Sequence, residues 1–183
     1  MPRAPNPHHQ QILAGAFETA SSVERSAFLA GMSHLFSGVT IVATDGPAGR
    51  CAVTVSAVSS ACADPPLMLA CINRRSPVNT AIHSNGIFCI NVLALGYEQL
   101  SDCFAGRTIN DASFDFATAE WDVAVTGAPI LRGAVAAFDC VLQSSHGAGT
   151  HTVFFGRVLD VTGRDGVPLL YGRRSYARPI TDV

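Results

Sequence analysis

Charged residues are scarce in this sequence. They make up only 14% of the 183 residues, against 48% hydrophobic residues, and the formal net charge is −2. No lysine-rich run is present and the arginines are mostly scattered, which argues against a nucleic acid or an anionic membrane as a partner. Because so few charges cover the surface, we expect part of the apolar area to be buried against a second copy of the chain, in a homodimer.

Long apolar runs are missing as well. No run reaches the length of a membrane span, and the first residues, MPRAPNPHHQQ, lack the apolar core of a signal peptide. We therefore expect a cytoplasmic protein that has no membrane partner. The six cysteines are widely spaced, with no C-x-x-C pair and no cysteine–histidine cluster at zinc spacing. This spacing argues against a disulfide framework and against a metal site.

The common catalytic and nucleotide-binding motifs are also absent. The sequence has no G-x-G-x-x-G after a strand, no Walker loop, no G-x-S-x-G elbow and no evident pair of carboxylates. A protein without catalytic groups of its own can use the chemistry of a cofactor.

Short β-branched strands between turn residues occupy most of the chain. GVTIVAT and CAVTVSAVSS (51–60) flank the turn DGPAG and predict a hairpin, and LMLACIN after Asp64-Pro65-Pro66 has the composition of a strand buried on both faces. Further strands are predicted over 87–93, 121–125, 130–147, 151–164 and 169–171. Their hairpin order predicts a mainly β fold, an antiparallel barrel with peripheral helices.

Helices are predicted only at the periphery. Ser21-x-x-Glu24 has the pattern of a capping box before an apolar helical face that runs to about residue 36. Ser76-Pro77 and Asn85-Gly86 mark the start and end of another helix, and further helices are predicted over 11–19 and 97–106. We expect a flexible arm over 1–20, one domain over 21–178 and a tail over 179–183.

The stretch from Thr54 to Ser76 is the first candidate site. Its small residues would let a flat ring lie close to the backbone, and Asn73, Arg75 and Ser76 at a helix start could bind a phosphate. One interpretation of this pattern is a flavin site. On spacing alone, an ordinary hairpin followed by a capped helix is slightly preferred.

Two further candidates lie nearer the C-terminus. His151 follows a glycine-rich turn and precedes an apolar strand, so it could orient a nicotinamide, or it could simply be satisfied by hydrogen bonds within the turn. Tyr171 and Tyr176, with Arg173 and Arg174, could stack on a base and bind phosphate, although a solvated basic tail is the preferred interpretation of these four residues.

Several segments of the chain, taken in order, resemble the short-chain flavin reductases. These are the reductase components of two-component flavin-dependent monooxygenases, such as the hydroxyphenylacetate and chlorophenol monooxygenase reductases. The resemblance covers about residues 25–178. Its segments are GVTIVAT, TVSAVSS, DPPLMLACINRRS, FCINVLALGYEQLSDCFAG, W-x(5)-GAPILRGAVAAFDC, GTHTVFFGRVLDV and PLLYGRRSY.

The resemblance implies an FMN-binding split β-barrel, Greek-key-like, that acts as an NAD(P)H:flavin oxidoreductase. It implies a homodimer with FMN or FAD near the subunit interface, reduced by a hydride from NADH or, less often, NADPH. The reduced flavin would leave, by diffusion, for a partner flavin-dependent monooxygenase. His151 would be the residue beside the nicotinamide. The flavin-binding residues implied are Thr54, Ser56, Ala57, Val58 and Ser60 for the ring and ribityl chain, Asn73, Arg75 and Ser76 for the phosphate, and Tyr171 and Arg174 at the flank of the site.

Two other functions stay open at this point. A related barrel with bound flavin could reduce another acceptor, such as a cobalt corrinoid. The chain could also bind flavin without turnover. The sequence does not decide between FMN and FAD, between NADH and NADPH, or between a tightly bound and a diffusing flavin.

Overall fold

The computed structural model describes residues 21–108 and 113–180, in two compact units that divide between Leu35 and Phe36. The described part of the first unit contains one helix, α2 (Arg25–Met32). Its N-cap is Glu24, which is extended at ψ 139° and makes no side-chain capping bond. The capping box predicted at Ser21 is therefore wrong, because the helix starts after Glu24. The predicted arm over 1–20 and the predicted helix over 11–19 lie outside the described residues.

The second unit consists mainly of strands. Its helical elements are α3 (Pro77–Asn85), α4 (Glu98–Phe104) and the 3₁₀ helix η1 (Phe116–Thr118). Its strands are β1 (Ser37–Gly38), β2 (Thr40–Thr44), β3 (Cys51–Val55), β4 (Val58–Ala63), β5 (Pro66–Asn73), β6 (Ile87–Val92), β7 (Trp121–Val123), β8 (Pro129–Leu131), β9 (Ala136–Ala148), β10 (His151–Gly163), β11 (Leu170–Gly172) and β12 (Ser175–Ala177). Among the described residues, no helix is long and apolar enough to cross a membrane.

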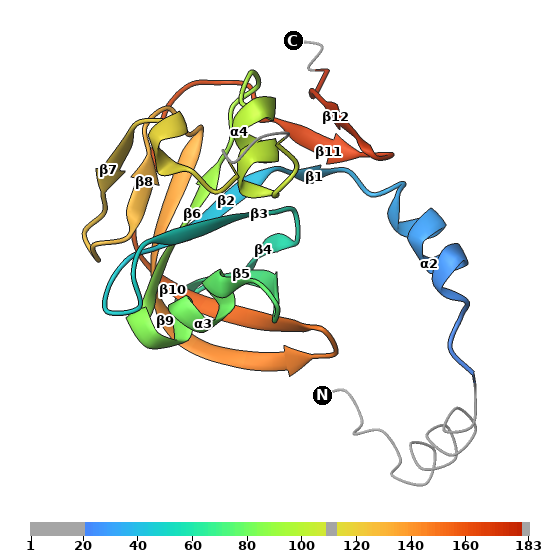
Figure 1. Ribbon diagram of the computed structural model, residues 1–183, viewed down its shortest axis with the longest axis horizontal. Coiled ribbons are helices and arrows are strands. Elements are labelled where there is room, and N and C mark those ends of the chain that lie inside the picture. Colours follow the sequence, from blue (N-terminus) through green and yellow to red (C-terminus); the bar gives the residue numbers. More distant parts are fainter. Residues whose placement is uncertain (1–20, 109–112, 181–183) are drawn as a thin grey trace, which may run out of the picture. The chain divides into compact units, whose positions relative to one another are not determined.

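Seven of these strands form one sheet in the order β3-β2-β6-β9-β10-β5-β4 (Figure 1). Its neighbouring strands all pair antiparallel, as the hairpin order predicts. A three-stranded sheet, β1-β11-β12, and the hairpin β7-β8 complete the unit. Helices α3 and α4 lie at opposite ends of it (Figure 1).

The sheet is split between its two edge strands. The single strand predicted over 51–60 is in fact two, β3 and β4, separated by the exposed pair Ser56-Ala57. One continuous strand cannot serve here, because β3 pairs with β2 at one edge of the sheet and β4 pairs with β5 at the other. The two edges approach each other at Ala57, whose carbonyl oxygen accepts a hydrogen bond from the Cys71 amide at 2.9 Å. The connection between β3 and β4 therefore lies at the split.

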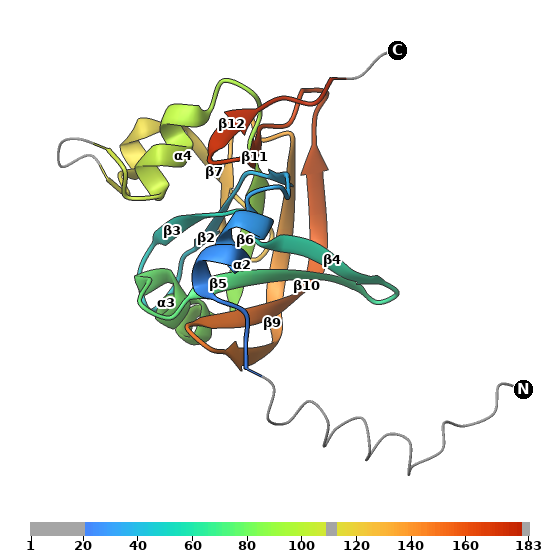
Figure 2. The ribbon, with the colours of Figure 1, turned by 90° about the vertical axis from the view of Figure 1, so that its right-hand side faces the viewer.

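Two other strand predictions need correction. The strand predicted over 130–147 is interrupted at Gly133, which has a φ of 94°, and divides into β8 and β9. Strand β5 is not buried on both faces, because Leu67, Met68 and Leu69 are only half-buried. They lie where β4 and β5 project as a hairpin (Figure 2), so this part of β5 has less protein around it.

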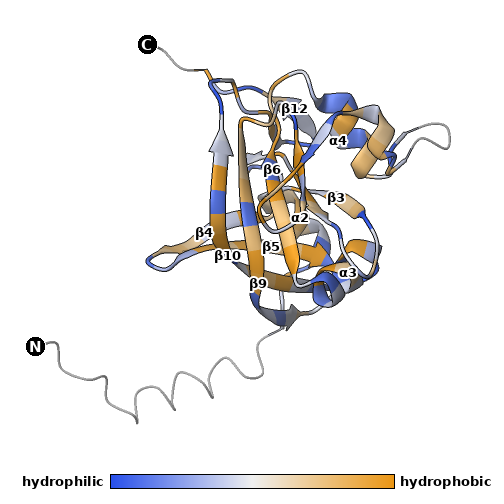
Figure 3. Cartoon of the chain, turned by 90° about the vertical axis from the view of Figure 1, so that its left-hand side faces the viewer, coloured by the Kyte–Doolittle hydropathy of each residue, from blue (hydrophilic) through white to orange (hydrophobic). Residues whose placement is uncertain are grey.

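Helix α3 begins and ends where the sequence predicts. Ser76 is its N-cap, Pro77 its first residue, and Gly86 its left-handed C-cap with a φ of 71°. The buried face of α3, with Val78 and Ile82, packs into a core cluster that also contains Phe88 and Phe154. The strands that supply this core, β6 above all, are coloured mainly hydrophobic in Figure 3. Helix α3 is thereby fixed on the sheet beside the split.

Candidate functional site

A cavity of about 220 Å³ opens at the split of the sheet. Six of the predicted site residues line it: Thr54, Ser56, Ala57, Asn73, Ser76 and His151. The remaining lining residues are Val53, Val55, Cys71 and Ile72. The structure therefore brings together residues that lie almost a hundred positions apart in the sequence.

The ends of two strands and the starts of a strand and a helix meet at this cavity. Strand β3 ends at Val55, and β5 ends at Asn73, which is paired directly with His151 at the start of β10. Three residues after Asn73, Ser76 occupies the N-cap position of α3. Side chains at strand ends and helix starts are not needed to complete the ladder or the core, so they are free to face a ligand.

Asn73 and Ser76 present hydrogen-bond donors to the cavity. Ser76 occupies the N-cap position, yet its side chain makes no capping bond. The Asn73 Oδ1 accepts the Arg75 amide at 2.9 Å, so this bond uses the oxygen and leaves the amide nitrogen of Asn73 without a partner among the described residues. These two donors at the N-terminus of α3 form a site suited to an anion.

His151 is half-buried and its ring is anchored on one side. The Nδ1 lies 2.9 Å from the Thr150 Oγ1. In the described part of the chain, no hydrogen-bond partner is found for Nε2. The turn contact predicted by the alternative interpretation of His151 is thus present, and it leaves the other ring nitrogen available.

A second, smaller cavity of about 100 Å³ adjoins the first, because Thr54 and Ser56 line both. The predicted residue Tyr171 lies in its wall, together with Tyr176 and Arg107. The Tyr176 hydroxyl donates to Asp102 Oδ1 at 2.6 Å, and burial followed by this bond raises the pKa of Tyr176. Tyr176 is therefore a neutral phenol at this wall.

A third cavity of about 220 Å³ shares Ser76 with the first. It is lined by Arg50, Cys51, Ala52, Ser76, Pro77, Val78, Phe114 and Phe116. The Arg50 guanidinium carbon lies 4.3 Å from the centre of the Phe116 ring. We refer to the first, second and third cavities together as the groove; it runs along β3 from Tyr171 to Phe116.

Five candidate residues from the sequence do not line the groove. Val58 packs against the core cluster of α3, and Ser60 lies on β4 opposite Met68. Arg75, Arg173 and Arg174 are exposed, and Arg173 and Arg174 have left-handed φ values of 50° and 62° in the turn between β11 and β12. In contrast, the groove contains Arg50, Arg107 and Phe116, which no motif in the sequence singles out as binding residues.

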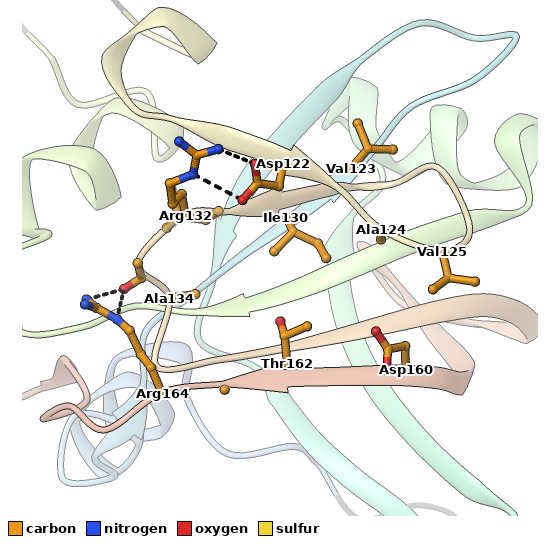
Figure 4. Close-up of a pocket in the computed structure, with 13 residues that line it drawn as sticks. Asp122, Val123, Ala124, Val125, Ile130, Arg132, Ala134, Asp160, Thr162 and Arg164 are labelled. Atoms are coloured by element: carbon orange, nitrogen blue, oxygen red, sulfur yellow. Dashed lines mark hydrogen bonds and ion pairs between the residues drawn. The ribbon is translucent and has the colours of Figure 1, made fainter.

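A cavity elsewhere in the unit is larger, at about 390 Å³, but it contains none of the predicted residues. It lies between the β7-β8 hairpin and the end of β10 (Figure 4). Its guanidinium groups already have partners: Arg132 is paired with Asp122 and Glu120, and Arg164 donates to the Gly133 carbonyl oxygen at 2.6 and 3.1 Å. The Arg132 hydrogen bond holds the pKa of Asp122 below its usual value. We therefore place the functional site at the groove.

The groove can bind a ligand but has little means of reacting with it. Its walls supply small residues, aromatic rings and hydrogen-bond donors. In the described residues, no three His, Cys, Asp or Glu side chains are grouped so as to hold a metal ion. The geometry suits a flat, phosphate-bearing ligand that brings its own chemistry.

Comparison with known proteins gives a consistent family. Residues 32–179 match the model of the flavin reductase like domain. The FMN reductase (NADH) RutF of Ancylobacter novellus is 44% identical over 160 residues, which are 86% of each chain.

Solved structures agree with that match. Nitrilotriacetate monooxygenase component B from Mycobacterium thermoresistibile superposes with a TM-score of 0.77 at 30% identity, over 85% of this chain and 87% of that one. The NADH:FAD oxidoreductase SgcE6 of Streptomyces globisporus superposes with a TM-score of 0.79 at 26% identity, over 90% of this chain and 99% of that one.

Proposed function

The chain belongs to the family of flavin reductase like domains, and from this premise we propose that it is an NAD(P)H:flavin oxidoreductase. Its substrates are a flavin, FMN or FAD, and a reduced nicotinamide nucleotide, for which NADH is preferred over NADPH. The relatives named above carry FMN, FAD and NADH in their names. A reaction in which a hydride passes from nicotinamide to flavin needs no catalytic motif in the protein, because the two bound molecules supply the chemistry.

One observation supports this function above the others. The cavity at the split joins a wall of small residues, Thr54 to Ala57, to two available donors, Asn73 and Ser76, at the start of a helix. The small residues fit the flat ring and the ribityl chain of a flavin, and the donors fit its phosphate. In this proposal, the flavin ring lies toward the second cavity, and Tyr171 in the wall of that cavity closes this end of the groove.

The residues of the chain bind and orient rather than react. The flavin and the nicotinamide, when bound, supply the hydride chemistry between them. The groove positions the two rings and limits water around them, which is where the protein contributes to the rate. We assign to His151 the positioning of the nicotinamide through its Nε2, because Nδ1 is held by Thr150. Arg75 and Arg174 are exposed and line none of the three cavities, so their flavin-binding roles stay predictions.

The partner is a flavin-dependent monooxygenase that receives the reduced flavin by diffusion. Support comes from the relative named as component B of a monooxygenase. We further propose that the chain acts as a homodimer. In the second unit, apolar side chains such as Leu159 and Val161 are exposed, which is consistent with a covered face in the assembly. The cytoplasmic location stays a prediction.

A direct assay tests the enzyme function. Purified protein is mixed with NADH and either FMN or FAD, and the absorbance of the reduced nicotinamide is followed. We expect NADH oxidation that requires both the protein and free flavin. Oxidation that requires a corrinoid, with free flavin inert, would favour the alternative acceptor. Flavin binding without any NADH oxidation would favour the other alternative, a flavin-binding protein without turnover.

A further inference from the structure

The third cavity of the groove has no role in the function proposed so far. It is as large as the cavity at the split, about 220 Å³ in each case, and the two meet at Ser76. If the flavin phosphate lies at Ser76 and Asn73, an FMN molecule ends there. The third cavity then begins where FMN stops.

The walls of this cavity suit a nucleobase. Phe114 and Phe116 supply two aromatic rings, and Arg50 lies 4.3 Å from the centre of the Phe116 ring. Aromatic rings and guanidinium planes are the surfaces on which adenine stacks in proteins. Pro77 and Val78 from the start of α3 add an apolar part to the wall. Such a wall favours a flat ring over a hydrated ion.

Arg50 is also available to a ligand electrostatically. Its side chain is exposed, and within the described residues it takes part in no ion pair with a carboxylate. Its guanidinium group lies over the rings of Phe116 and Trp121. A guanidinium held in this way beside Ser76 can meet a second phosphate that follows the first.

We propose that the third cavity binds the adenosine phosphate half of a flavin dinucleotide, so that the protein holds FAD more tightly than FMN. This inference rests on the proposed function, because it assumes that the flavin phosphate lies at Ser76. Adenosine phosphate also occurs in NADH. The flavin is the source we assign, because the cavity meets the cavity at the split at Ser76, where the second half of a flavin dinucleotide continues from the first phosphate.

Equilibrium titration tests the assignment without turnover. The dissociation constants of FAD and FMN are measured by flavin fluorescence for the parent protein and for Arg50→Ala. We expect Arg50→Ala to weaken FAD binding about tenfold, the effect of one lost stacking and charge contact, and to leave FMN within about twofold. Arg157→Ala, which removes another exposed arginine, is the matched control and should change neither constant.

The opposite results overturn the proposal. An equal loss for both flavins would mean that Arg50 serves the flavin half, and no loss for either would mean that the cavity holds no adenosine. A rise in the KM for NADH with unchanged flavin constants would assign the cavity to the nicotinamide nucleotide instead. If NADH is oxidised neither with FMN nor with FAD, the proposed function is refuted. The dissociation constants of FAD and FMN would still test whether the third cavity binds adenosine.

Cysteine protection offers a test on the parent protein. Cys71 lines the cavity at the split, and Cys51 lines the third cavity. Burial raises the pKa of Cys51, so alkylation is run at about pH 9, where more thiolate is present. By mass spectrometry, we expect FMN to protect Cys71 alone and FAD to protect both thiols. Equal protection of Cys51 by FMN and FAD, or by neither, overturns the proposal. Burial raises the pKa of Cys140 to about 12, and its lack of modification reports that the protein stays folded.

Discussion

A serine at a helix start can cap the helix or bind a ligand, and Ser76 has the position for the first role but is available for the second. A capping serine bonds an amide of the first turn, and its loss usually destabilises the helix by about 1 kcal/mol. Ser76 has the N-cap position without that bond. Its hydroxyl therefore contributes little to the stability of α3 and is available to a ligand.

We expect Ser76→Ala to weaken flavin binding without destabilising the protein. The dissociation constant of FMN should rise about tenfold, because one hydrogen bond to a charged phosphate is lost. The free energy of unfolding should change by less than about 0.5 kcal/mol, since no capping bond disappears. Flavin fluorescence and urea denaturation measure the two effects. A clear loss of stability with unchanged flavin affinity would show that Ser76 serves the helix only.

His151 should affect the reaction more than the binding of flavin. We expect His151→Ala to lower kcat about tenfold, because the nicotinamide is less well positioned, while the flavin dissociation constant stays within about twofold. His151→Gln, which keeps a hydrogen-bond donor, should recover part of the rate. Stopped-flow reduction with NADH deuterated at C4 should show a larger isotope effect in His151→Ala. Lost flavin binding with normal turnover at saturation would contradict the role given to His151.

Residues that line the groove were predictable from the sequence where a local signal accompanies them. Ser76 is followed by a proline, and His151 follows a glycine-rich turn, so both stand out in the sequence. Arg50 and Arg107 reach the groove only through packing, Arg50 against Phe116 and Arg107 against Tyr171. Their positions depend on contacts between distant segments, and no spacing in the sequence indicates such contacts.

At the scale of elements, local signals predicted the ends of helices better than the ends of strands. The bounds of α3 follow from Ser76-Pro77 and from Gly86, and the structure confirms them. The break between β3 and β4 has no comparable signal, because Ser56-Ala57 is followed by further β-forming residues. What ends β3 is a change of partner from β2 to β5. Strand pairing between distant segments therefore decided the feature on which the groove depends.

Gly156 in β10 is required by packing, although the sequence does not mark it. A Cβ atom there would collide with the Phe88 ring and would lie 2.7 Å from the Cys140 Cβ. Gly156 also lies at an irregularity in the pairing of β10 with β9. We expect Gly156→Ala to lower the free energy of unfolding by about 2 kcal/mol, because the core is overpacked.

Gly38 provides the matched control for this substitution. It lies in β1, its backbone needs no left-handed φ, and a Cβ atom there would meet no atom within 4 Å. Gly38→Ala should leave the urea midpoint close to that of the parent. Equal effects of the two substitutions would show that backbone freedom, rather than the contact with Phe88 and Cys140, sets the requirement for Gly156.

At the scale of the whole molecule, few charged residues are available to cover the surface, so parts of the surface of a single chain are apolar. Strand β10 pairs with β5 only as far as Arg157, so among the described residues the stretch from 158 to 163 has a free edge on that side. Leu159 and Val161 on this stretch are 44% and 54% exposed. Free strand edges with apolar side chains are usually covered in soluble proteins. This edge is therefore where we expect a second copy of the chain to pack.

Light scattering tests the dimer and this edge together. The parent protein should have twice the mass of the 19.2 kDa chain. Val161→Lys should shift it toward the single-chain mass, because a buried interface does not tolerate an unpaired charge. Val123→Lys introduces the same charge at a valine that is 77% exposed on β7 and should leave the mass doubled. A parent protein of single-chain mass would contradict the homodimer. Dissociation by Val123→Lys alone would move the interface from β10 to the β7-β8 hairpin.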